Sequence, residues 1–418
     1  MKVFKFGGAS VNSVERIKNV AEIIKTYGNE NLMVIISAIG KTTNALEKVT
    51  EAFYAGNTEE ALSLFNVVKQ NHLTTTKYLL VTSYNQTIAV LTDIFTEVEW
   101  LLHDKPVRNF DYYYDQIVCV GELLSTCIVS AFLNEKGIKN DWIDVRDIVR
   151  TDNNFREANV NWTETRENLY KQDLFKKANI CITQGFIGST DQNESTTLGR
   201  EGSDYTAAIF ANLYNAESLT IWKDVEGVMS ADPKEFPEAT LLNELSFNEV
   251  IEMAFYGARV IHPKTIKPLE NLKIPLHVKS FINPALKGTT ISNKQGRNLP
   301  PIVIIKSKQV LVHLQSQDFS FVGEQPISEL YKQFCHLNIK PNLIQTGAVS
   351  LQVCLDNRAD KIEQIAVSAS EIFDVQVEKD LSLLTIRHYN NDLLEKMTAA
   401  KDIVLVQKTK ETVQVLYR

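Results

Sequence analysis

Strand-like and helix-like patterns alternate along the first two thirds of the chain, and this alternation constrains the fold more than any other feature. Residues 3–6 read as a short strand, and Leu32–Ser37 form the continuous apolar run typical of a strand buried in a parallel sheet. Between them, apolar side chains recur at helical spacing at Val14, Ile17, Val20 and Ile24. Later strand patterns, separated by helical ones, cover residues 142–145, 180–184 and 218–223. We therefore expect an α/β fold with three αβα layers and a mainly parallel central sheet, in which ligands bind beyond the carboxyl ends of the strands.

The pattern also predicts how the chain divides into domains. Its 418 residues exceed one ordinary core. A helical stretch from about Thr42 to Tyr114 has polar surroundings, which favour an insertion or a lid. After residue 278 the character changes, and residues 298–301 (Asn-Leu-Pro-Pro) are a candidate linker. We expect one domain over residues 1–298 and a regulatory or dimerising region over residues 302–418.

The C-terminal region reads as small α+β modules with antiparallel sheets. Its strand patterns cover residues 310–314, 349–355, 382–387 and 413–417, and its helical patterns cover residues 326–335 and 361–373. Only about 30 residues follow Arg387, too few for a complete second four-stranded unit. We therefore expect the second module to be shortened.

Composition disfavours several classes of partner. The formal net charge of −7 argues against binding to nucleic acid or to a membrane surface. No apolar run approaches the length that crosses a membrane, and the N-terminus enters a strand without a signal-peptide pattern. The five cysteines are odd in number and lack metal-binding spacing, so we expect buried thiols in a cytoplasmic protein.

Residues 197–204 (Thr-Leu-Gly-Arg-Glu-Gly-Ser-Asp) are the strongest indication of chemistry. They place a glycine hinge, a guanidinium, a hydroxyl and a carboxylate directly before a helical pattern over residues 205–216. A helix N-terminus attracts anions, and Arg200 can grip a carboxylate or phosphate at two points. Asp204 would repel an anion, so we expect it to orient a lysine or a metal-bound phosphate. A second glycine turn, residues 5–10 (Lys-Phe-Gly-Gly-Ala-Ser), follows the first strand, and two such turns suggest two anionic substrates.

Each of these segments, taken alone, also has an ordinary structural explanation. Gly7 and Gly8 fit a common strand-to-helix turn, because no Gly-Lys-Ser/Thr follows as in a Walker loop. Residues 37–44 (Ser-Ala-Ile-Gly-Lys-Thr-Thr-Asn) could bind a small polar substrate or cap the next helix. Glu122 could pair with a substrate amine or act as a favourable first-turn acid.

Taken together, the segments resemble those of the aspartate kinases (aspartokinases) of the amino-acid kinase family. Residues 5–10 are similar to the family's Lys-Phe-Gly-Gly-Thr-Ser signature. Other matching segments follow in the family's order and approximate spacing: 37–44, 121–125 (Gly-Glu-Leu-Leu-Ser), 185–188 (Gly-Phe-Ile-Gly), 197–204, 224–234, 257–265 and 278–279. The ordered set is specific and covers most of residues 1–292. The C-terminal third resembles the family's ACT modules, ferredoxin-like α+β units that pair across a dimer and bind an amino-acid effector.

The resemblance implies ATP-dependent phosphorylation of the side-chain carboxylate of L-aspartate to 4-phospho-L-aspartate, the entry step toward lysine, methionine and threonine. Lys5 would stabilise the transferring phosphate, and Asp204 would hold the lysines in place. ATP and its phosphates would be bound by Gly7, Gly8, Ser10, Lys223, Asp224, Gly227, Met229, Asp232, Lys234 and Arg259. Aspartate would be bound by Ser37, Thr43, Glu122, Arg200 and Ser203, with Glu122 on its ammonium and Arg200 on its α-carboxylate.

The same resemblance implies the cofactors and the assembly. Mg²⁺ would be held mainly by phosphates and water, with no dedicated protein cage of ligands. The acceptor carboxylate is already ionised near neutral pH, so no general base is required and catalysis reduces to alignment and charge neutralisation. A homodimer is expected, with no nucleic-acid or membrane partner.

Several residues depart from the family pattern. Glu201 stands where a small residue is common, and we expect it to point to solvent. Gly347-Ala348 stand where lysine-inhibited members carry Ser-Glu, so an effector ammonium would lose its carboxylate and lysine inhibition should be weak or absent. The predicted nucleotide-binding positions also differ from the family pattern. Lys223 stands where Thr is usual, and Met229 stands where Tyr is usual. Lys234 stands where Arg is usual and Arg259 where Lys is usual, which changes the donor geometry.

Two other functions stay open at this point. A kinase for glutamate or acetylglutamate would share the fold, although the helical insertion and the ACT-like tail count against it. A catalytically inert amino-acid sensor would have lost the lysine or the aspartate, whereas Lys5, Arg200 and Asp204 are all present.

Overall fold

The computed structural model describes residues 1–258, 260–294, 299–318 and 320–418, which form two compact units. The first unit comprises Met1–Val228, Leu241–Ile251 and Arg259–Gly296, and the second comprises Met229–Thr240, Glu252–Ala258 and Arg297–Arg418. The chain therefore passes between the units several times, whereas the sequence predicted a single boundary near residues 298–302. Residue 298 of the expected linker lies outside the described residues.

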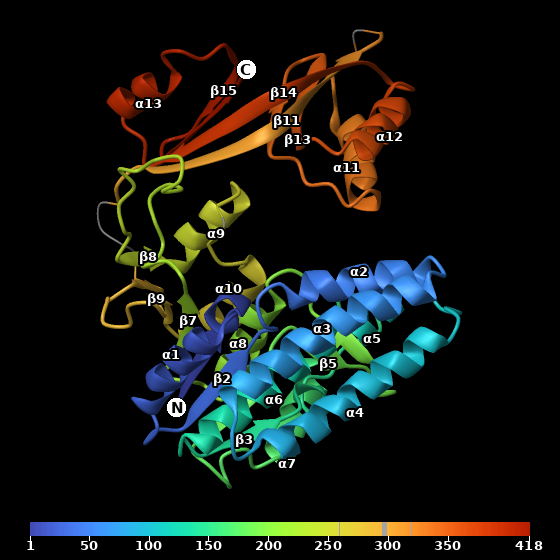
Figure 1. Ribbon diagram of the computed structural model, residues 1–418. Helices are drawn as coiled ribbons and strands as arrows, with labels where there is room; N and C mark the ends of the chain where they lie inside the picture. Colours follow the sequence, from blue (N-terminus) through green and yellow to red (C-terminus); the bar gives the residue numbers. More distant parts are fainter. Residues whose placement is uncertain (259, 295–298, 319) are drawn as a thin grey trace. The chain divides into compact units, whose positions relative to one another are not determined.

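The first unit is built on an eight-stranded sheet (Figure 1). Across the sheet the order is β3 (Asn140–Ile143), β4 (Ile180–Gln184), β2 (Leu32–Ile36), β1 (Lys2–Phe6), β7 (Ser218–Lys223), β9 (Leu276–Ser280), β10 (Thr289–Ser292) and β8 (Glu244–Ser246). The first six strands are mutually parallel, and β10 runs antiparallel to β9. The expected mainly parallel sheet is confirmed.

Helices cover both faces of this sheet. All five residues of β2 and of β4 are buried, and since side chains alternate between faces, complete burial requires cover on each. The covering and connecting helices are α1 (Val14–Lys25), α6 (Val120–Glu135), α7 (Trp162–Lys171), α8 (Gly202–Leu213), α9 (Phe247–Phe255) and α10 (Pro263–Leu272), with short 3₁₀ turns η1 (Gly8–Val11) and η2 (Val145–Asp147). Ser13 caps α1 by accepting a hydrogen bond from the Arg16 N–H.

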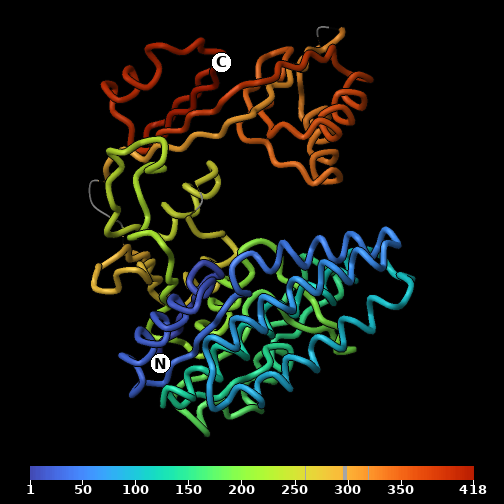
Figure 2. The backbone as a smooth tube through the Cα atoms, viewed as in Figure 1, coloured from blue at the N-terminus to red at the C-terminus, as the bar shows by residue number. Residues whose placement is uncertain are grey.

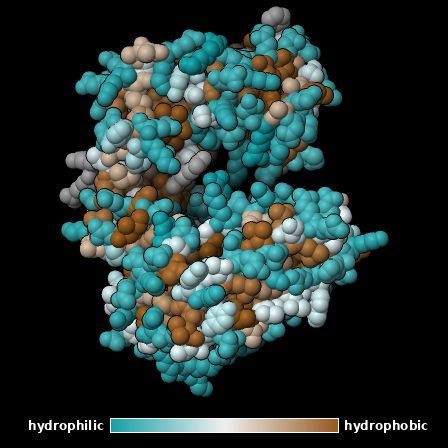
Figure 3. Space-filling model, viewed as in Figure 1, coloured by the Kyte–Doolittle hydropathy of each residue, from teal (hydrophilic) through white to brown (hydrophobic). Residues whose placement is uncertain are grey.

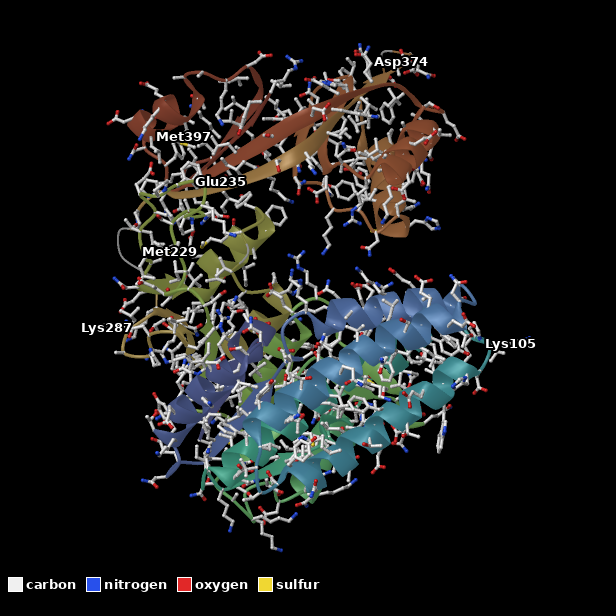
Figure 4. The ribbon with its side chains drawn as sticks, viewed as in Figure 1. Lys105, Met229, Glu235, Lys287, Asp374 and Met397 are labelled. Carbon is white, nitrogen blue, oxygen red and sulfur yellow. The ribbon has the colours of Figure 1, made fainter. Side chains whose placement is uncertain are left out.

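The long stretch expected to be helical forms α2 (Thr42–Tyr54), α3 (Thr58–Leu79), α4 (Tyr84–His103) and α5 (Phe110–Val118). Lys105 marks the connection between α4 and α5 (Figure 4). Hydrophilic and hydrophobic residues are interspersed over the visible face of these helices (Figure 3).

One sequence expectation about membranes is corrected by this region. Phe110–Glu135, which spans α5 and α6, is long and apolar enough by length and composition to cross a membrane, with a mean hydropathy of 1.8 over its best window. However, 83% of that window is buried inside the protein, as in the core helix of a globular domain.

The second unit contains a six-stranded antiparallel sheet. Its order is β12 (Leu343–Thr346), β13 (Ser350–Asp356), β11 (Ile302–Ser316), β14 (Phe373–Arg387), β16 (Thr412–Tyr417) and β15 (Ile403–Lys408). The tube in Figure 2 shows β11 and β14 as two long strands that run side by side, each much longer than its sequence pattern predicted. Helices α11 (Glu324–His336) and α12 (Ala359–Ala369) bury one face of the first half of the sheet.

The second half of this sheet corrects the expectation of too few strands. The stretch Ile302–Lys306, at the start of β11, pairs with the end of β14. Together with β14, β16 and β15 it completes four strands in this half of the sheet. The strand precedes the first module in sequence, so counting residues after Arg387 could not find it. This half contains one helix, α13 (Asn391–Thr398), among the described residues 299–318 and 320–418. Ala231 and Phe236, from the segment Met229–Thr240, pack against its apolar cluster.

Candidate active site

A cavity of about 750 Å³ lies in the first unit, where β1 and β2 end and α8 begins. It gathers eight of the predicted site residues from four separate segments of the chain. They are Lys5, Gly8, Ser37, Thr43, Glu122, Arg200, Ser203 and Asp204. Both predicted catalytic residues and all five predicted aspartate-binding residues therefore line one cavity.

The short parallel strands explain why Lys5 reaches this cavity. In the sheet Lys5 lies between Ile35 of β2 and Ile221 of β7, one residue before the end of β1. Its Nζ lies 2.7 Å from Oδ1 of Asp204, in the first turn of α8. Burial alone would raise the pKa of Asp204, but the ammonium groups of Lys5 and Lys223 outweigh it and lower the pKa below its usual value. Asp204 is therefore an ionised anchor for the lysine.

Close backbone approach explains the glycine at position 8. A Cβ there would lie 2.8 Å from the carbonyl oxygens of both Ala38 and Gly40. The turns that follow β1 and β2 are thus packed directly against each other, and the Gly40 N–H donates to the Gly8 carbonyl at 3.1 Å. Only glycine fits this approach without moving one of the turns.

The turn before α8 is equally tight. Gly185 passes so close to Ser203 that a Cβ on the glycine would lie 2.5 Å from the serine Cβ.

Glu201, the residue before α8, has a left-handed φ of 55°. The sequence placed its side chain in solvent, but Glu201 is half-buried, and its Oε2 accepts a hydrogen bond of 2.9 Å from the His262 N–H. This bond ties the Arg200 turn to the start of α10.

Glu122 is buried in the first turn of α6, and one of its carboxylate oxygens has no partner. Oε1 accepts a long hydrogen bond of 3.3 Å from the Ala38 N–H. Oε2 is fully buried and has no hydrogen-bond donor among the residues the structure describes. Burial raises the pKa of Glu122 to about 8, against the opposing effects of the Ala38 N–H and of Lys5. A cationic ligand in the cavity would satisfy this oxygen and favour its ionised form.

Two arginines line the cavity, and their surroundings differ. Arg200 is exposed and forms no hydrogen bond or ion pair with any described residue. Arg156 lies over the ring of Tyr114 at 4.5 Å and pairs with Asp111 at 3.3 Å and with Glu47 at 3.7 Å. The guanidinium of Arg200 is thus free for an anionic ligand, while that of Arg156 is already engaged.

Sequence reasoning missed the part of the lining to which Arg156 belongs. We call it the helix-loop group: Glu47 of α2, Asp111 and Tyr114 of α5, and the loop Asn154–Glu157. None of these residues lies in a glycine turn or a motif that the sequence singled out. The only local signal was a polar segment, residues 151–154 (Thr-Asp-Asn-Asn), that follows the strand β3 and the 3₁₀ turn η2.

Fewer of the residues predicted to bind ATP line the cavity. Gly8 lines the cavity, and a Cβ on Gly7 would lie 3.3 Å from the Lys5 Nζ. Ser10 is buried and donates to the Trp222 carbonyl at 3.5 Å, and the Lys223 Nζ donates to the Val260 carbonyl at 2.7 Å. The remaining predicted positions fall outside the cavity lining: Asp224 and Gly227 belong to the first unit, Met229, Asp232 and Lys234 belong to the second, and Arg259 lies outside the described residues.

Comparisons with known proteins agree with this fold. The profile of the amino acid kinase family matches residues 1–280. The chain is 31% identical, over 420 aligned residues, to lysine-sensitive aspartokinase 3 of Escherichia coli (strain K12), covering 96% of this chain and 89% of that protein. The chain belongs to the amino acid kinase family and, within it, to the aspartokinases.

Solved structures resemble the chain over its whole length. The crystal structure of E. coli aspartokinase III in complex with aspartate and ADP (R-state) has a TM-score of 0.84 at 27% identity, covering 100% of this chain and 96% of the other. The same enzyme in complex with lysine and aspartate (T-state) has a TM-score of 0.80 at 27% identity, covering 100% and 95%. The higher score belongs to the complex with aspartate and ADP.

Proposed function

We propose that this protein transfers the terminal phosphoryl group of ATP to the side-chain carboxylate of L-aspartate, giving 4-phospho-L-aspartate and ADP. One observation carries the proposal: charges left open in a single cavity match the charged groups of an α-amino acid. The Glu122 carboxylate lacks a donor on one oxygen, and the Arg200 guanidinium lacks an acceptor among the described residues. Lys5, held by Asp204, is a cation for the transferred phosphoryl group.

The fit to aspartate follows from hydrogen-bond chemistry. An ammonium carries three donors and suits the buried oxygen of Glu122, whereas a planar guanidinium suits a carboxylate bound at two points. Hydroxyl groups of Ser37, Thr43 and Ser203 line the same cavity and can orient the remaining oxygens. We therefore assign the ammonium to Glu122 and the α-carboxylate to Arg200.

The chemistry requires no base. A side-chain carboxylate with an ordinary pKa of about 3.9 is ionised at neutral pH. One of its oxygens forms a bond to the terminal phosphorus while the bond from that phosphorus to the bridging oxygen of ADP breaks. Lys5 stabilises the negative charge on the phosphoryl oxygens, and Asp204 keeps the ammonium in place. Catalysis then consists of alignment and charge neutralisation.

We propose that Mg²⁺ enters with the nucleotide. Among the described residues, no three or more His, Cys, Asp or Glu side chains are grouped so that they could hold a metal ion. Asp204, the acid beside the predicted phosphate position, is already paired with Lys5. Mg²⁺ keeps several waters and is commonly held by substrate phosphates, so the chain does not need its own set of ligands.

The same cavity should discriminate between aspartate and the two alternative substrates, acetylglutamate and glutamate. Acetylglutamate has no ammonium, so its binding would leave the buried Glu122 oxygen without a partner, which costs about 1–3 kcal/mol. Glutamate has the ammonium but places its side-chain carboxylate one methylene further from the α-carbon. A site aligned for aspartate should therefore accept glutamate poorly.

An assay of acyl phosphate formation tests the proposal. Hydroxylamine traps the product as a hydroxamate, and ADP release is followed in parallel, with L-aspartate, L-glutamate, N-acetyl-L-glutamate and, as a matched control, N-acetyl-L-aspartate. We expect L-aspartate to exceed each of the others by about 100-fold or more in kcat/KM. ATP consumption that does not depend on aspartate, or equal turnover of N-acetyl-L-aspartate, would contradict the proposal.

Effector control, assembly and localisation stay predictions. The E. coli relative is named lysine-sensitive. In this chain Gly347 and Ala348 form the turn between β12 and β13, so neither offers a carboxylate to an effector ammonium. We expect lysine at concentrations below about 1 mM, the upper end of ordinary KM values, to leave more than half of the activity. A steady-state assay with added lysine checks this expectation. Light scattering on the purified protein tests the homodimer, and cell fractionation tests the cytoplasmic location.

A further inference from the structure

Asp115 is a fully buried carboxylate in α5 that does not line the cavity. It accepts hydrogen bonds from two segments that are distant in sequence. The backbone N–H groups of Arg156 and Thr197 donate to Oδ2 at 3.0 and 2.8 Å, and the Thr197 hydroxyl donates to Oδ1 at 2.7 Å. Burial raises the pKa of Asp115 to about 6, opposed by these donors, so at pH 7.5 the group is ionised and acts purely as an acceptor.

The neighbouring residue acts on the same strand. The Gln116 side chain donates to the Ser195 carbonyl at 2.8 Å and accepts from the Ser195 N–H at 3.1 Å. Ser195 and Thr197 are the first and last residues of β6 (Ser195–Thr197), which pairs on its other side with β5 (Ile187–Ser189). Two consecutive side chains of α5 therefore take the place of a third strand along the edge of β6.

Both segments held by Asp115 lead directly into the cavity. Arg156 lies in the lining loop Asn154–Glu157 and has a left-handed φ of 69°, a conformation that surrounding contacts must hold. Thr197 precedes Arg200 by three residues. The Ala158 N–H also donates to the Thr197 carbonyl at 3.0 Å, so the two segments are joined to each other beside the carboxylate.

We propose that Asp115 is a positioning residue that fixes the Arg156 loop and the Arg200 turn relative to each other, and thereby sets the affinity of the cavity for the acceptor substrate. The proposal rests on the proposed function, because it assigns aspartate to this cavity. Removing the carboxylate leaves two backbone donors without partners next to the site. The segments must then move to find other acceptors, and small misplacements of binding groups have large effects on affinity and rate.

The conservative substitution separates geometry from charge. In Asp115→Asn the amide oxygen can accept both backbone N–H groups, and the amide nitrogen can donate to the Thr197 hydroxyl, which then accepts. We expect this variant to keep the KM for aspartate within about threefold of the wild type, since all three hydrogen bonds survive. Asp115→Ala should raise that KM about tenfold or more, with the KM for ATP changed by less than about threefold.

Controls make the outcome decisive. Asp93→Ala removes an exposed carboxylate from α4 and should leave both KM values unchanged. Circular dichroism and thermal melting verify folding, since a merely destabilised protein loses active fraction without a selective change in the KM for aspartate. A folded Asp115→Ala variant with an unchanged KM for aspartate would overturn the proposal, as would an Asp115→Asn variant as impaired as the alanine variant.

A second variant decides the matter if Asp115→Ala does not fold. Thr197→Val removes only the hydroxyl bond to Oδ1 and keeps the side-chain volume. We expect it to raise the KM for aspartate about threefold or more, and an unchanged KM would overturn the proposal. If the wild type shows no aspartate-dependent turnover, the proposed function fails and this inference fails with it. Normal wild-type turnover together with unaffected variants would refute the inference alone.

Discussion

The cavity is lined by two groups of residues that handle charge in opposite ways. In the motif group, Glu122 has an unpartnered oxygen and Arg200 has no partner among the described residues. This group consists of Lys5, Gly8, Ser37, Ala38, Gly40, Thr43, Asn44, Glu122, Phe186 and Gly199–Asp204. In the helix-loop group, the guanidinium of Arg156 is paired with acids and lies over an aromatic ring. Apart from the ion pair of Lys5 and Asp204, the motif group keeps binding groups open for a ligand, whereas the Arg156 guanidinium is satisfied internally.

The open groups mark the part of the cavity where direct contacts with a ligand are expected. A buried polar group without a partner is costly, so the Glu122 carboxyl gains from a ligand that supplies the partner. A guanidinium that already has partners, such as that of Arg156, contributes shape and order rather than direct affinity. We therefore expect large functional effects at Lys5, Glu122 and Arg200 and smaller ones in the helix-loop group, beside which Asp115 would act by holding the Arg156 loop and β6 in place.

The largest effect is expected at the ion pair of Lys5 and Asp204. Lys5→Ala removes the cation that offsets charge on the transferred phosphoryl group, and we expect kcat to fall on the order of 10³-fold with little change in the KM for aspartate. Asp204→Asn should lower kcat in the same direction because the lysine loses its anchor. Steady-state kinetics check both variants, and near-normal turnover in either would contradict the role assigned to this ion pair.

The next effect is expected at Glu122. Glu122→Gln keeps the shape but cannot form an ion pair with the substrate ammonium, so the KM for aspartate should rise about 100-fold. In the wild type, aspartate binding should strengthen as the pH rises toward 8, because fewer Glu122 side chains must lose a proton to pair with the ammonium. The variant should lose this dependence, which a series of KM values between about pH 6 and 8.5 measures.

The two arginines of the cavity should differ in their effect on aspartate binding. Arg200→Ala removes an open guanidinium and should raise the KM for aspartate about 30-fold. Arg156→Ala removes a guanidinium that is already paired, so a rise of only about threefold to fivefold is expected. Equal effects, or a larger effect at Arg156, would show that internal pairing does not distinguish the two groups.

The smallest effect is expected at Glu201, the acid that departs from the family pattern. Glu201→Gln removes a negative charge from the cavity lining while keeping an acceptor for the His262 N–H. The KM for aspartate should fall about twofold because a repulsive charge is lost. Glu201→Ala serves as the comparison, since it also removes the hydrogen bond, and a lower KM in the alanine variant than in the glutamine variant would contradict this assignment.

The two groups of lining residues also differ in how well the sequence predicted them. The motif group follows strand ends and glycine turns, and the ordered set of its segments, through the resemblance to the aspartokinases, pointed to Lys5, Glu122, Arg200 and Asp204, although each segment alone also had an ordinary structural explanation. The helix-loop group depends on which face of α5 meets which loop, and on the left-handed backbone at Arg156, neither of which leaves a periodic signal. Its members could not be found by pattern.

In the second unit, the sequence did not predict which strands pair, because strands that are neighbours in the sheet are far apart along the chain. The strand patterns near residues 310–314 and 382–387 were found, but both strands extend well beyond them. The fourth strand of the second half comes from Ile302–Lys306, ahead of the module that separates it from its partners. Hydrophobic periodicity predicts that a strand exists, and it says nothing about which strand lies beside it.

The most direct test is a calorimetric titration of L-aspartate into the protein with ADP present, at pH 7 in two buffers with different ionisation enthalpies. At this pH the buried carboxyl of Glu122 is mainly protonated, and pairing with the substrate ammonium ionises it. We expect release of about one proton per aspartate bound by the wild type, and none by Glu122→Gln. Binding without proton release in the wild type, or identical release in both proteins, would contradict the account.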